Sequence, residues 1–282
     1  MRIIDTHTRL VNVTGAQWNV GRDEILARHA AHAQECSPAE CGYAGHRDGV
    51  VDSFVHVSST VERELCIAEV DWVERMARLH DLDLVMVAGV DPTRSGDEIL
   101  GDLEAFATSE SFRGVRLPVG MPSDLPFVPQ LLNWLAERSL VVEFSPTAQQ
   151  VPSWVRALEQ HPHLVSVVGY DTWVITPDSK VSDDWREAFR AYADGNVDAW
   201  QVTLPSDGVT AVVSPEIMRP WLELGVELLG WDRLMFASTL SLDSSAALYP
   251  KLIADFEELI AFASAEDRAK FWSENAAEAY RM

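Results

Sequence analysis

The sequence predicts an α/β fold, a single (β/α)8 TIM barrel with long rim loops that spans residues 1–282. Strand-like and helix-like segments alternate along the whole chain, and each of eight strand-like segments is followed by a helix-like one. Residues 82–90 form a near-continuous apolar run, which is typical of a strand buried on both faces. No linker, low-complexity tract or short repeat divides the chain, so we expect one domain.

The predicted strands are short apolar or β-branched segments, and they lie in the opening ten residues and at 50–57, 82–90, 113–119, 140–144, 164–168, 197–204 and 233–237. The predicted helices have apolar residues three or four positions apart, as Val70, Val73 and Met76 are. These helices lie at 62–80, 95–108, 125–138, 151–161, 183–194 and 215–229, with two more within 248–280.

Two connections are longer than a compact barrel needs. Residues 11–49 follow the opening strand and contain a helix-like piece at 23–35, and residues 171–182 follow the sixth strand. Long loops at the C-terminal end of a barrel are commonly lids or substrate walls. We therefore interpret 11–49 as a candidate lid.

Charge and composition narrow the class of partner. The net charge of −22 and the pI near 4.6 argue against nucleic acid and against anionic membrane surfaces. The odd count of three cysteines and the absence of a signal-like segment favour a reducing compartment, and we expect a cytoplasmic protein. The expected partner is a small-molecule substrate, and the oligomeric state stays open, with a homodimer as one option.

The opening strand ends in polar residues. The apolar pair Ile3-Ile4 leads into Asp5, His7 and Arg9. In a parallel barrel, the C-terminal ends of the strands carry the chemistry. We therefore expect the side chains of this segment to face an active site.

Six segments resemble, in order, one branch of the amidohydrolase superfamily, the amidohydrolase-related lactonases and TIM-barrel hydrolases. The closing pair is the most specific, because these proteins carry Asp-Arg-Leu-Met-Phe-Gly-Ser-Asp and end near Asn-Ala-x-x-x-Tyr-Arg. The matching segments are Asp5–His7, Ser53–Val57, Glu69–Trp72, Phe112–Arg116, Asp232–Phe236 and Asn275–Arg281. The resemblance spans the chain, and it implies the barrel fold and an enzyme of small metabolites.

The same resemblance exposes a lost metal motif. The family opens with Asp-x-His-x-His, has Asp-His on the sixth strand and places Asp after the eighth. Here Arg9, Tyr170 and Thr239 stand at three of these four positions, and only His7 remains. A guanidinium is always charged in practice and cannot ligate a metal. We therefore expect no divalent metal in the usual place and no other cofactor.

The remaining polar residues at the strand ends are candidates for catalysis. His7 is the best general base or acid, because imidazole titrates near neutral pH. Tyr170 is a candidate proton donor or oxyanion ligand, and Asp171 a candidate partner that orients His7. The alternative roles are a relic hydrogen-bonded histidine, a packing aromatic and a loop-capping aspartate.

Other residues are candidates for substrate binding. Arg9 and Arg116 would supply fixed positive charge for a carboxylate or oxyanion, unless each is held in a structural ion pair. His56 matches a family histidine, with a buried structural histidine as the alternative. Glu143 is unusual in an apolar strand and must be paired there, and Arg116 on the neighbouring strand is the expected partner.

Two further residues and one cluster complete the set. Trp173 and Thr239 are expected near the rim, where an aromatic ring suits a planar substrate.

A separate cluster in the first long connection has ligand types that would suit zinc, but its spacing matches no standard module, so ordinary loop residues are the simpler interpretation. That cluster is His29, His32, Cys36, Cys41 and His46.

These observations lead to one first hypothesis and two alternatives. The first is a metal-independent, amidohydrolase-like enzyme that hydrolyses a small lactone, ester or aromatic carboxylate metabolite. The second is a lyase or cyclase on the same barrel, acting by decarboxylation, dehydration or cyclisation. The third is a catalytically inactive barrel that binds a metabolite or a partner protein.

Overall fold

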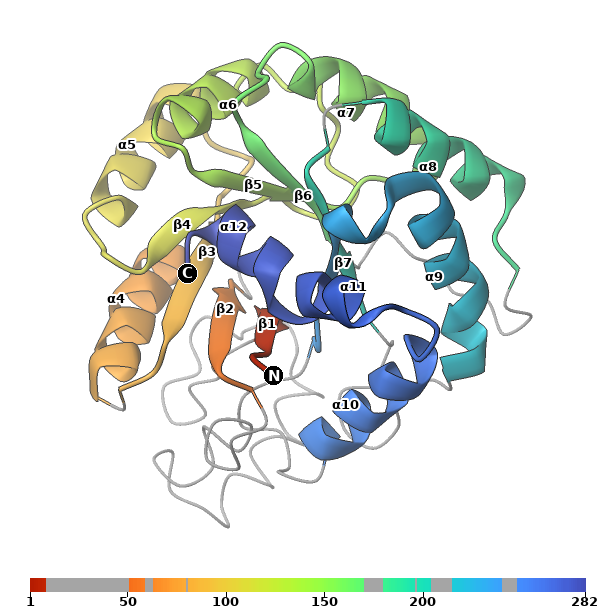
Figure 1. Ribbon diagram of the computed structural model, residues 1–282. Coiled ribbons are helices and arrows are strands. Elements are labelled where there is room, and N and C mark those ends of the chain that lie inside the picture. Colours follow the sequence, from red (N-terminus) through yellow and green to blue (C-terminus); the bar gives the residue numbers. More distant parts are fainter. Residues whose placement is uncertain are drawn as a thin grey trace, which may run out of the picture.

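The computed structural model describes residues 1–8, 51–58, 63–79, 81–169, 180–195, 197–203, 215–239 and 248–282. Its sheet has eight parallel strands that follow one another in chain order (Figure 1). These strands are β1 (Ile4–Thr8), β2 (Ser53–Val57), β3 (Leu84–Gly89), β4 (Phe112–Arg116), β5 (Val141–Phe144), β6 (Val165–Val168), β7 (Ala199–Val202) and β8 (Leu234–Phe236). The predicted (β/α)8 barrel is confirmed, and every predicted strand is present.

Hydrogen bonds join β8 back to β1 and so close the barrel. The Thr6 hydroxyl donates to the Phe236 carbonyl over 2.7 Å. The backbone N–H of Ser238 donates to the Asp5 carboxylate over 2.9 Å. The backbone N–H of Thr239 donates to the His7 carbonyl over 2.8 Å. All three contacts use residues of the Asp5–His7 segment, so that segment helps to hold β8 against β1.

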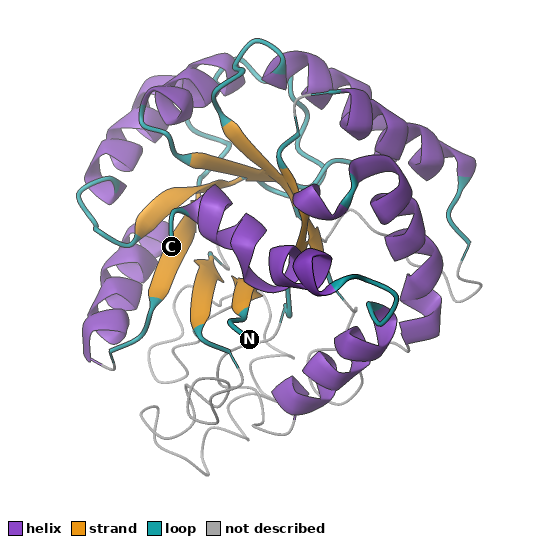
Figure 2. Ribbon diagram, viewed as in Figure 1, coloured by secondary structure: helices purple, strands orange, loops and turns teal. Residues whose placement is uncertain are grey.

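Helices form an outer ring around the strands (Figure 2). The predicted helices at 183–194 and 215–229 have the observed bounds. The ring comprises α4 (Arg63–Leu79), α5 (Gly96–Phe106), α6 (Val128–Glu137), α7 (Val151–Leu158), α8 (Asp183–Asp194), α9 (Pro215–Leu229) and α10 (Leu248–Leu259). The chain then ends in α11 (Ala265–Ala269), a π-helical stretch at Lys270–Glu274 and α12 (Asn275–Tyr280).

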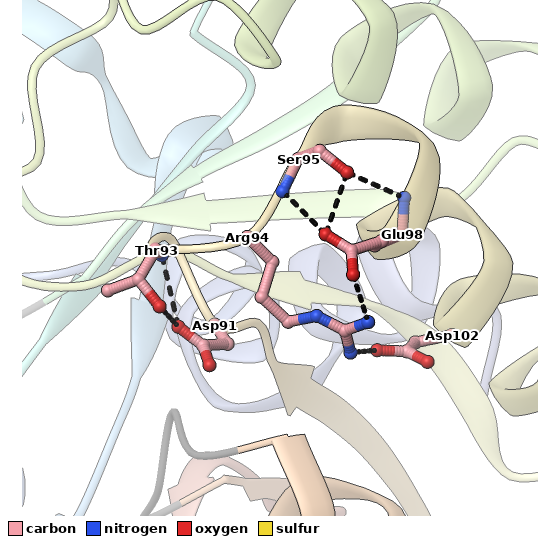
Figure 3. Close-up of polar contacts among 6 residues, drawn as sticks. All are labelled: Asp91, Thr93, Arg94, Ser95, Glu98 and Asp102. Carbon is pink, nitrogen blue, oxygen red and sulfur yellow. Dashed lines mark hydrogen bonds and ion pairs between the residues drawn. The ribbon is translucent and has the colours of Figure 1, made fainter.

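The start of α5 shows how local sequence sets an element boundary (Figure 3). Ser95 and Glu98 form a capping box, in which each side chain bonds the backbone N–H of the other residue. Arg94 then bridges the Glu98 and Asp102 carboxylates over 3.0 and 2.7 Å. The Ser95 hydrogen bond and the Arg94 charge lower the pKa of Glu98 to about 2. The helix therefore begins where the sequence predicts it.

Alternation along the strands divides the core into two parts. Outward-facing residues such as Phe54, Val142 and Trp200 pack under the helices. Inward-facing residues fill the barrel, among them Ile4, Val55, Val57, Val85, Val87, Val141, Val167, Ala199 and Met235. The interior is a packed core, as barrels of this kind require.

The last helix covers the N-terminal end of the barrel, where it crosses in front of the strands near the chain's N-terminus (Figure 1). Ala276, Ala279 and Tyr280 pack against the inward-facing residues. Asn275 ties this helix to β8, since its side-chain amide donates to the carbonyls of Trp231 and Leu234 over 2.7 and 2.8 Å. The closing Asn-Ala-x-x-x-Tyr-Arg segment therefore has a structural function.

The long connections that the sequence predicts fall mostly outside the described residues. The candidate lid at 11–49 lies wholly outside them, and so does 171–179. Among the described helices, none combines the length and the apolar character that crossing a membrane requires.

Candidate active site

A bulge in β1 directs His7 into the barrel. Ile4 faces inward, and Asp5 faces outward to Tyr249 of α10. Strict alternation would place His7 on the same side as Asp5. The pairing with β2 shifts register between Asp5 and Thr8, and such an extra residue re-aims the side chains beyond it. His7 accordingly contacts two inward-facing residues, Arg116 and Gln201.

Gln201 and Arg116 both contact the Nδ1 of the His7 ring. The Gln201 amide donates through its nitrogen to the Thr6 carbonyl over 2.8 Å and to the Glu143 carboxylate over 3.2 Å. Its oxygen therefore faces the Nδ1 of His7, 3.3 Å away. An amide oxygen only accepts, so Gln201 favours the tautomer with its proton on Nδ1, whereas Arg116, which only donates, favours a lone pair on Nδ1. The first tautomer presents Nε2 as the basic nitrogen.

Glu143 is a fully buried carboxylate in the barrel interior. One oxygen accepts hydrogen bonds from the Tyr280 hydroxyl and from Gln201, and the other lies 3.5 Å from Nη1 of Arg116. Burial, followed by the Glu143 charge, raises the pKa of Tyr280 well above its usual value, so the phenol stays a donor. The predicted pairing of Glu143 with Arg116 is confirmed.

Arg116 connects Glu143 to His7. Its Nη1 lies 3.4 Å from the Nδ1 of His7, and its side chain is about nine-tenths buried. The guanidinium can donate to Nδ1 only in the tautomer in which that nitrogen carries no proton. A fixed positive charge and a basic nitrogen therefore share one end of the barrel.

Two further residues lie at the same end of the barrel, one just after β5 and one just after β6. Ser145 and Gly169 come directly after the last residues of these strands, and the Gly169 N–H donates to the Phe144 carbonyl over 2.9 Å. A side chain at 169 would begin 2.7 Å from the Ser145 hydroxyl and 3.3 Å from Nη1 of Arg116. A side chain at 169 would therefore displace the Ser145 hydroxyl and press on the Arg116 guanidinium.

Asp5 lies behind this cluster, between β1, β8 and α10. Its carboxylate accepts hydrogen bonds from the backbone of His7 and Ser238 and from the Tyr249 hydroxyl, the last over 2.7 Å. Complete burial outweighs these donors and raises the pKa of Asp5 to about 6. Nearby Thr239 has a left-handed backbone, with φ of 58°, which is costly for a β-branched residue.

His56 lies at the same end of the barrel but faces outward. It alternates with the inward-facing Val55 and Val57, and its Nε2 lies 3.1 Å from the Glu69 carboxylate of α4. Ser58 donates to the same carboxylate. The prediction that His56 binds substrate in the barrel is not supported, because its ring points into the layer between β2 and α4 and is fully buried. The alternative, a buried structural histidine, describes it.

Several predicted site residues fall outside the described part of the chain. These are Arg9, Tyr170, Asp171 and Trp173, together with the cluster at positions 29–46. Of the rest, His7, Arg116 and Glu143 are brought together, and Thr239 lies next to the His7 carbonyl. We expected His7, His56, Arg116, Tyr170 and Thr239 to share one end of the barrel. The four described residues do so, and Tyr170 lies outside the described part of the chain.

Sequence reasoning missed four residues of this cluster, which are Ser145, Gly169, Gln201 and Tyr280. Gln201 gave a usable signal, since it is a polar residue at an inward-facing position of a predicted strand, as Glu143 is. Ser145 gave a weaker one, two positions beyond Glu143. Tyr280 gave none, because it enters the barrel from the opposite end.

The described donors at this end do not suit a divalent metal ion. Among the described residues, no three histidine, cysteine, aspartate or glutamate side chains gather closely enough to hold one. His7 stands beside a guanidinium, and a hydroxyl side chain, Thr239, follows β8. Zinc sites use three or four nitrogen, sulfur or carboxylate ligands.

Solved structures with the same fold are named as hydrolases and as a decarboxylase. An amidohydrolase from Burkholderia multivorans with bound zinc matches with a TM-score of 0.74 at 17% identity, over 100% of both chains. A probable 2-pyrone-4,6-dicarboxylic acid hydrolase from Acinetobacter baumannii, with citric acid bound, matches with a TM-score of 0.65 at 14% identity, over 100% of both chains. A 2,6-dihydroxybenzoate decarboxylase from Rhizobium has a TM-score of 0.63 at 12% identity, covering 100% of this chain and 99% of that one.

The sequence itself assigns the family. The model described as Amidohydrolase matches residues 4–282, which is nearly the whole chain. The chain therefore belongs to the amidohydrolase family.

Proposed function

We propose that this protein hydrolyses a lactone or ester bond of a small organic acid at the C-terminal end of its barrel. The observation that carries the proposal is the contact of His7 with Arg116, 3.4 Å from ring nitrogen to guanidinium, with Gln201 orienting the ring. A base and a fixed positive charge are the two groups that ester hydrolysis needs at one place.

The proposed reaction uses water as the nucleophile. The Nε2 of His7 takes a proton from water as its oxygen bonds to the substrate carbonyl carbon, and the carbonyl electron pair moves to oxygen. Arg116 stabilises that oxyanion. The carbon–oxygen ester bond then breaks, and the His7 imidazolium returns the proton to the departing alkoxide. Glu143 positions Arg116 and remains an acceptor throughout.

The remaining roles rest on the sequence. Arg9 is proposed as a second positive group for the substrate, Tyr170 as a proton donor or oxyanion ligand, and Asp171 as a partner of His7. Trp173 and Thr239 would line the substrate. No step is assigned to a metal ion, because the described donor set does not suit one. A small-molecule partner and a cytoplasmic location stay part of the proposal.

Decarboxylation is the second candidate, because the fold is shared with a 2,6-dihydroxybenzoate decarboxylase. The same residues would then act differently. The bond between the ring carbon and the carboxylate breaks, carbon dioxide leaves, and the electron pair stays on the ring carbon, which takes a proton from a protonated His7. Hydrolysis gives products that together are heavier by one water, and decarboxylation gives a product lighter by one carbon dioxide, so mass spectrometry separates the two.

The test is a panel of small lactones, esters and hydroxybenzoates, followed by His7→Gln on any substrate that turns over. Loss of the general base should lower kcat by about a hundredfold or more with little change in melting temperature. His163→Gln is the matched control, because His163 is exposed on the turn before β6. Unchanged kcat in His7→Gln would contradict the mechanism. Binding of panel members without any turnover would favour the inactive, metabolite-binding barrel.

A further inference from the structure

We propose that Ser145, Gly169 and Arg116 form a subsite for a carboxylate group of the substrate beside the bond that reacts, so that Arg116 contacts both this carboxylate and the oxyanion. This inference rests on the proposed function of the same site and specifies its substrate class. It also gives roles to Ser145 and Gly169, which the proposed reaction leaves unused.

The Ser145 hydroxyl is a buried donor awaiting an acceptor. The residue is 3% exposed, and its Oγ makes no hydrogen bond within the described part of the chain. A buried hydroxyl without a partner costs free energy, so a structural role alone does not account for it. Alternation after β5 turns Ser145 inward, two positions beyond Glu143.

Gly169 lies where this hydroxyl and the Arg116 guanidinium approach the backbone. Glu143 pairs with Val167 and Phe144 with Val168, so Ser145 and Gly169 are the next neighbours across the two strands. The missing side chain would point between the Ser145 hydroxyl and the Arg116 guanidinium, at 2.7 and 3.3 Å. Both donors therefore approach one place on the interior side of the backbone.

The chemistry of the two donors selects a carboxylate. Arg116 supplies a permanent positive charge with N–H groups in a fixed fork, and Ser145 supplies a single neutral donor. A carboxylate has two oxygens and accepts from both at once. Most of the charge-assisted bonding would come from Arg116, which is already buried and held by Glu143, so little order is lost on binding.

This assignment predicts opposite effects on stability and on binding. Ser145→Ala removes a buried donor that has no described partner, so the melting temperature without ligand should stay the same or rise. The same change removes one hydrogen bond to a charged ligand and should weaken carboxylate binding by about tenfold. A merely structural serine would not combine these two effects.

The experiment is isothermal titration of the full chain with benzoate and citrate, and with benzamide as a neutral analogue of benzoate. The unaltered protein should bind at least one carboxylate and bind benzamide at least tenfold more weakly. Gly169→Ala should abolish carboxylate binding, because the added methyl group enters the shared space. Ser166→Ala is the control, because Ser166 faces outward to Asp198 and its loss should lower stability without changing affinity.

Three results would overturn the subsite: no carboxylate binding by the unaltered protein, equal affinity for benzoate and benzamide, or Ser145→Ala affinity equal to that of the unaltered protein. Turnover of lactones or esters is measured separately. If turnover depends on His7 but Ser145→Ala leaves KM unchanged, the subsite proposal fails and the proposed reaction stands. If Ser145→Ala loses carboxylate binding but no panel member is turned over, the proposed reaction fails and the subsite stands.

Discussion

The hydroxyl of Tyr280, on the last helix, donates a hydrogen bond to the Glu143 carboxylate inside the barrel. The two residues are 137 positions apart and enter the interior from opposite ends. Glu143 in turn lies beside Arg116, which lies beside His7. The helix that covers the N-terminal end of the barrel is thereby linked to the site at the C-terminal end.

Tyr280→Phe should lower the free energy of unfolding by about 1–3 kcal/mol, because Glu143 loses a donor in a buried setting. It should also lower kcat/KM, since Arg116 is then less firmly held. Tyr192→Phe is the matched control. Tyr192 is equally buried, but within the described residues its hydroxyl has no hydrogen-bond partner, so its loss should be neutral or stabilising. Denaturant unfolding of both variants measures the difference, and equal effects would contradict the assignment.

Asp5 should make stability depend on pH in an unusual direction. Burial raises its pKa from about 3.8 to about 6, so the folded chain holds this proton more tightly than the unfolded chain does. The stabilisation that protonated Asp5 gives the folded state is complete below about pH 4. It is lost as the pH rises to about 6, and the stability does not change further above that pH through this group. This difference between the pKa of Asp5 in the folded and in the unfolded chain corresponds to roughly 3 kcal/mol.

Asp5→Asn isolates this contribution, because the amide keeps an acceptor for the backbone N–H groups and can donate to Tyr249. The free energy of unfolding of Asp5→Asn minus that of the unaltered protein should increase between pH 4 and pH 6 and then stay constant. Urea unfolding at several pH values measures it. A difference that does not change with pH would show that Asp5 titrates normally in the folded protein.

Chelation should not change the melting temperature or activity of the purified protein, and elemental analysis should find far less than one equivalent of zinc or manganese. The reason is the donor set, in which Arg116 contacts His7 and Thr239 follows β8, together with Arg9 and Tyr170 in the sequence. The control is a family member with the full Asp-x-His-x-His motif, which should lose metal under the same treatment. One equivalent of tightly bound metal would contradict this prediction.

Much of the fold could be predicted because the strands and helices alternate and their apolar spacing is regular. Residues 183–194 and 215–229 show apolar residues on one helical face, and their bounds were predicted to the residue. The predicted strands extend beyond the observed ones by up to three residues at an end, as at 50–57 against Ser53–Val57, and 197–204 is two residues too long at each end. The ends of a strand depend on pairing with its neighbours, which the local sequence does not contain.

The site was predicted less completely than the fold. His7, Arg116 and Glu143 were found because each is a polar residue in or directly after an apolar strand. Tyr280 could not be found this way, because its hydroxyl reaches Glu143 only through the packing of α12 across the barrel end. The orientation of His7 depends on a bulge in β1, which appears only in the pairing register with β2.

His56 lies at the expected end of the barrel with its ring against Glu69 of α4, as in the alternative of a buried structural histidine, and this contact supports a final prediction. His56→Asn should lower the free energy of unfolding by roughly 3 kcal/mol, because it leaves the buried Glu69 carboxylate without its histidine partner. It should leave KM and carboxylate affinity unchanged, since the ring faces α4 and not the barrel interior. The double variant of His56→Asn and Glu69→Gln should lose less unfolding free energy than the two single variants lose in sum, because the two side chains act as one pair.

Arg116→Met provides the contrast and should weaken carboxylate affinity far more than His56→Asn does. Loss of affinity in folded His56→Asn, measured on the sample used for unfolding, would restore the substrate-binding role that the structure argues against.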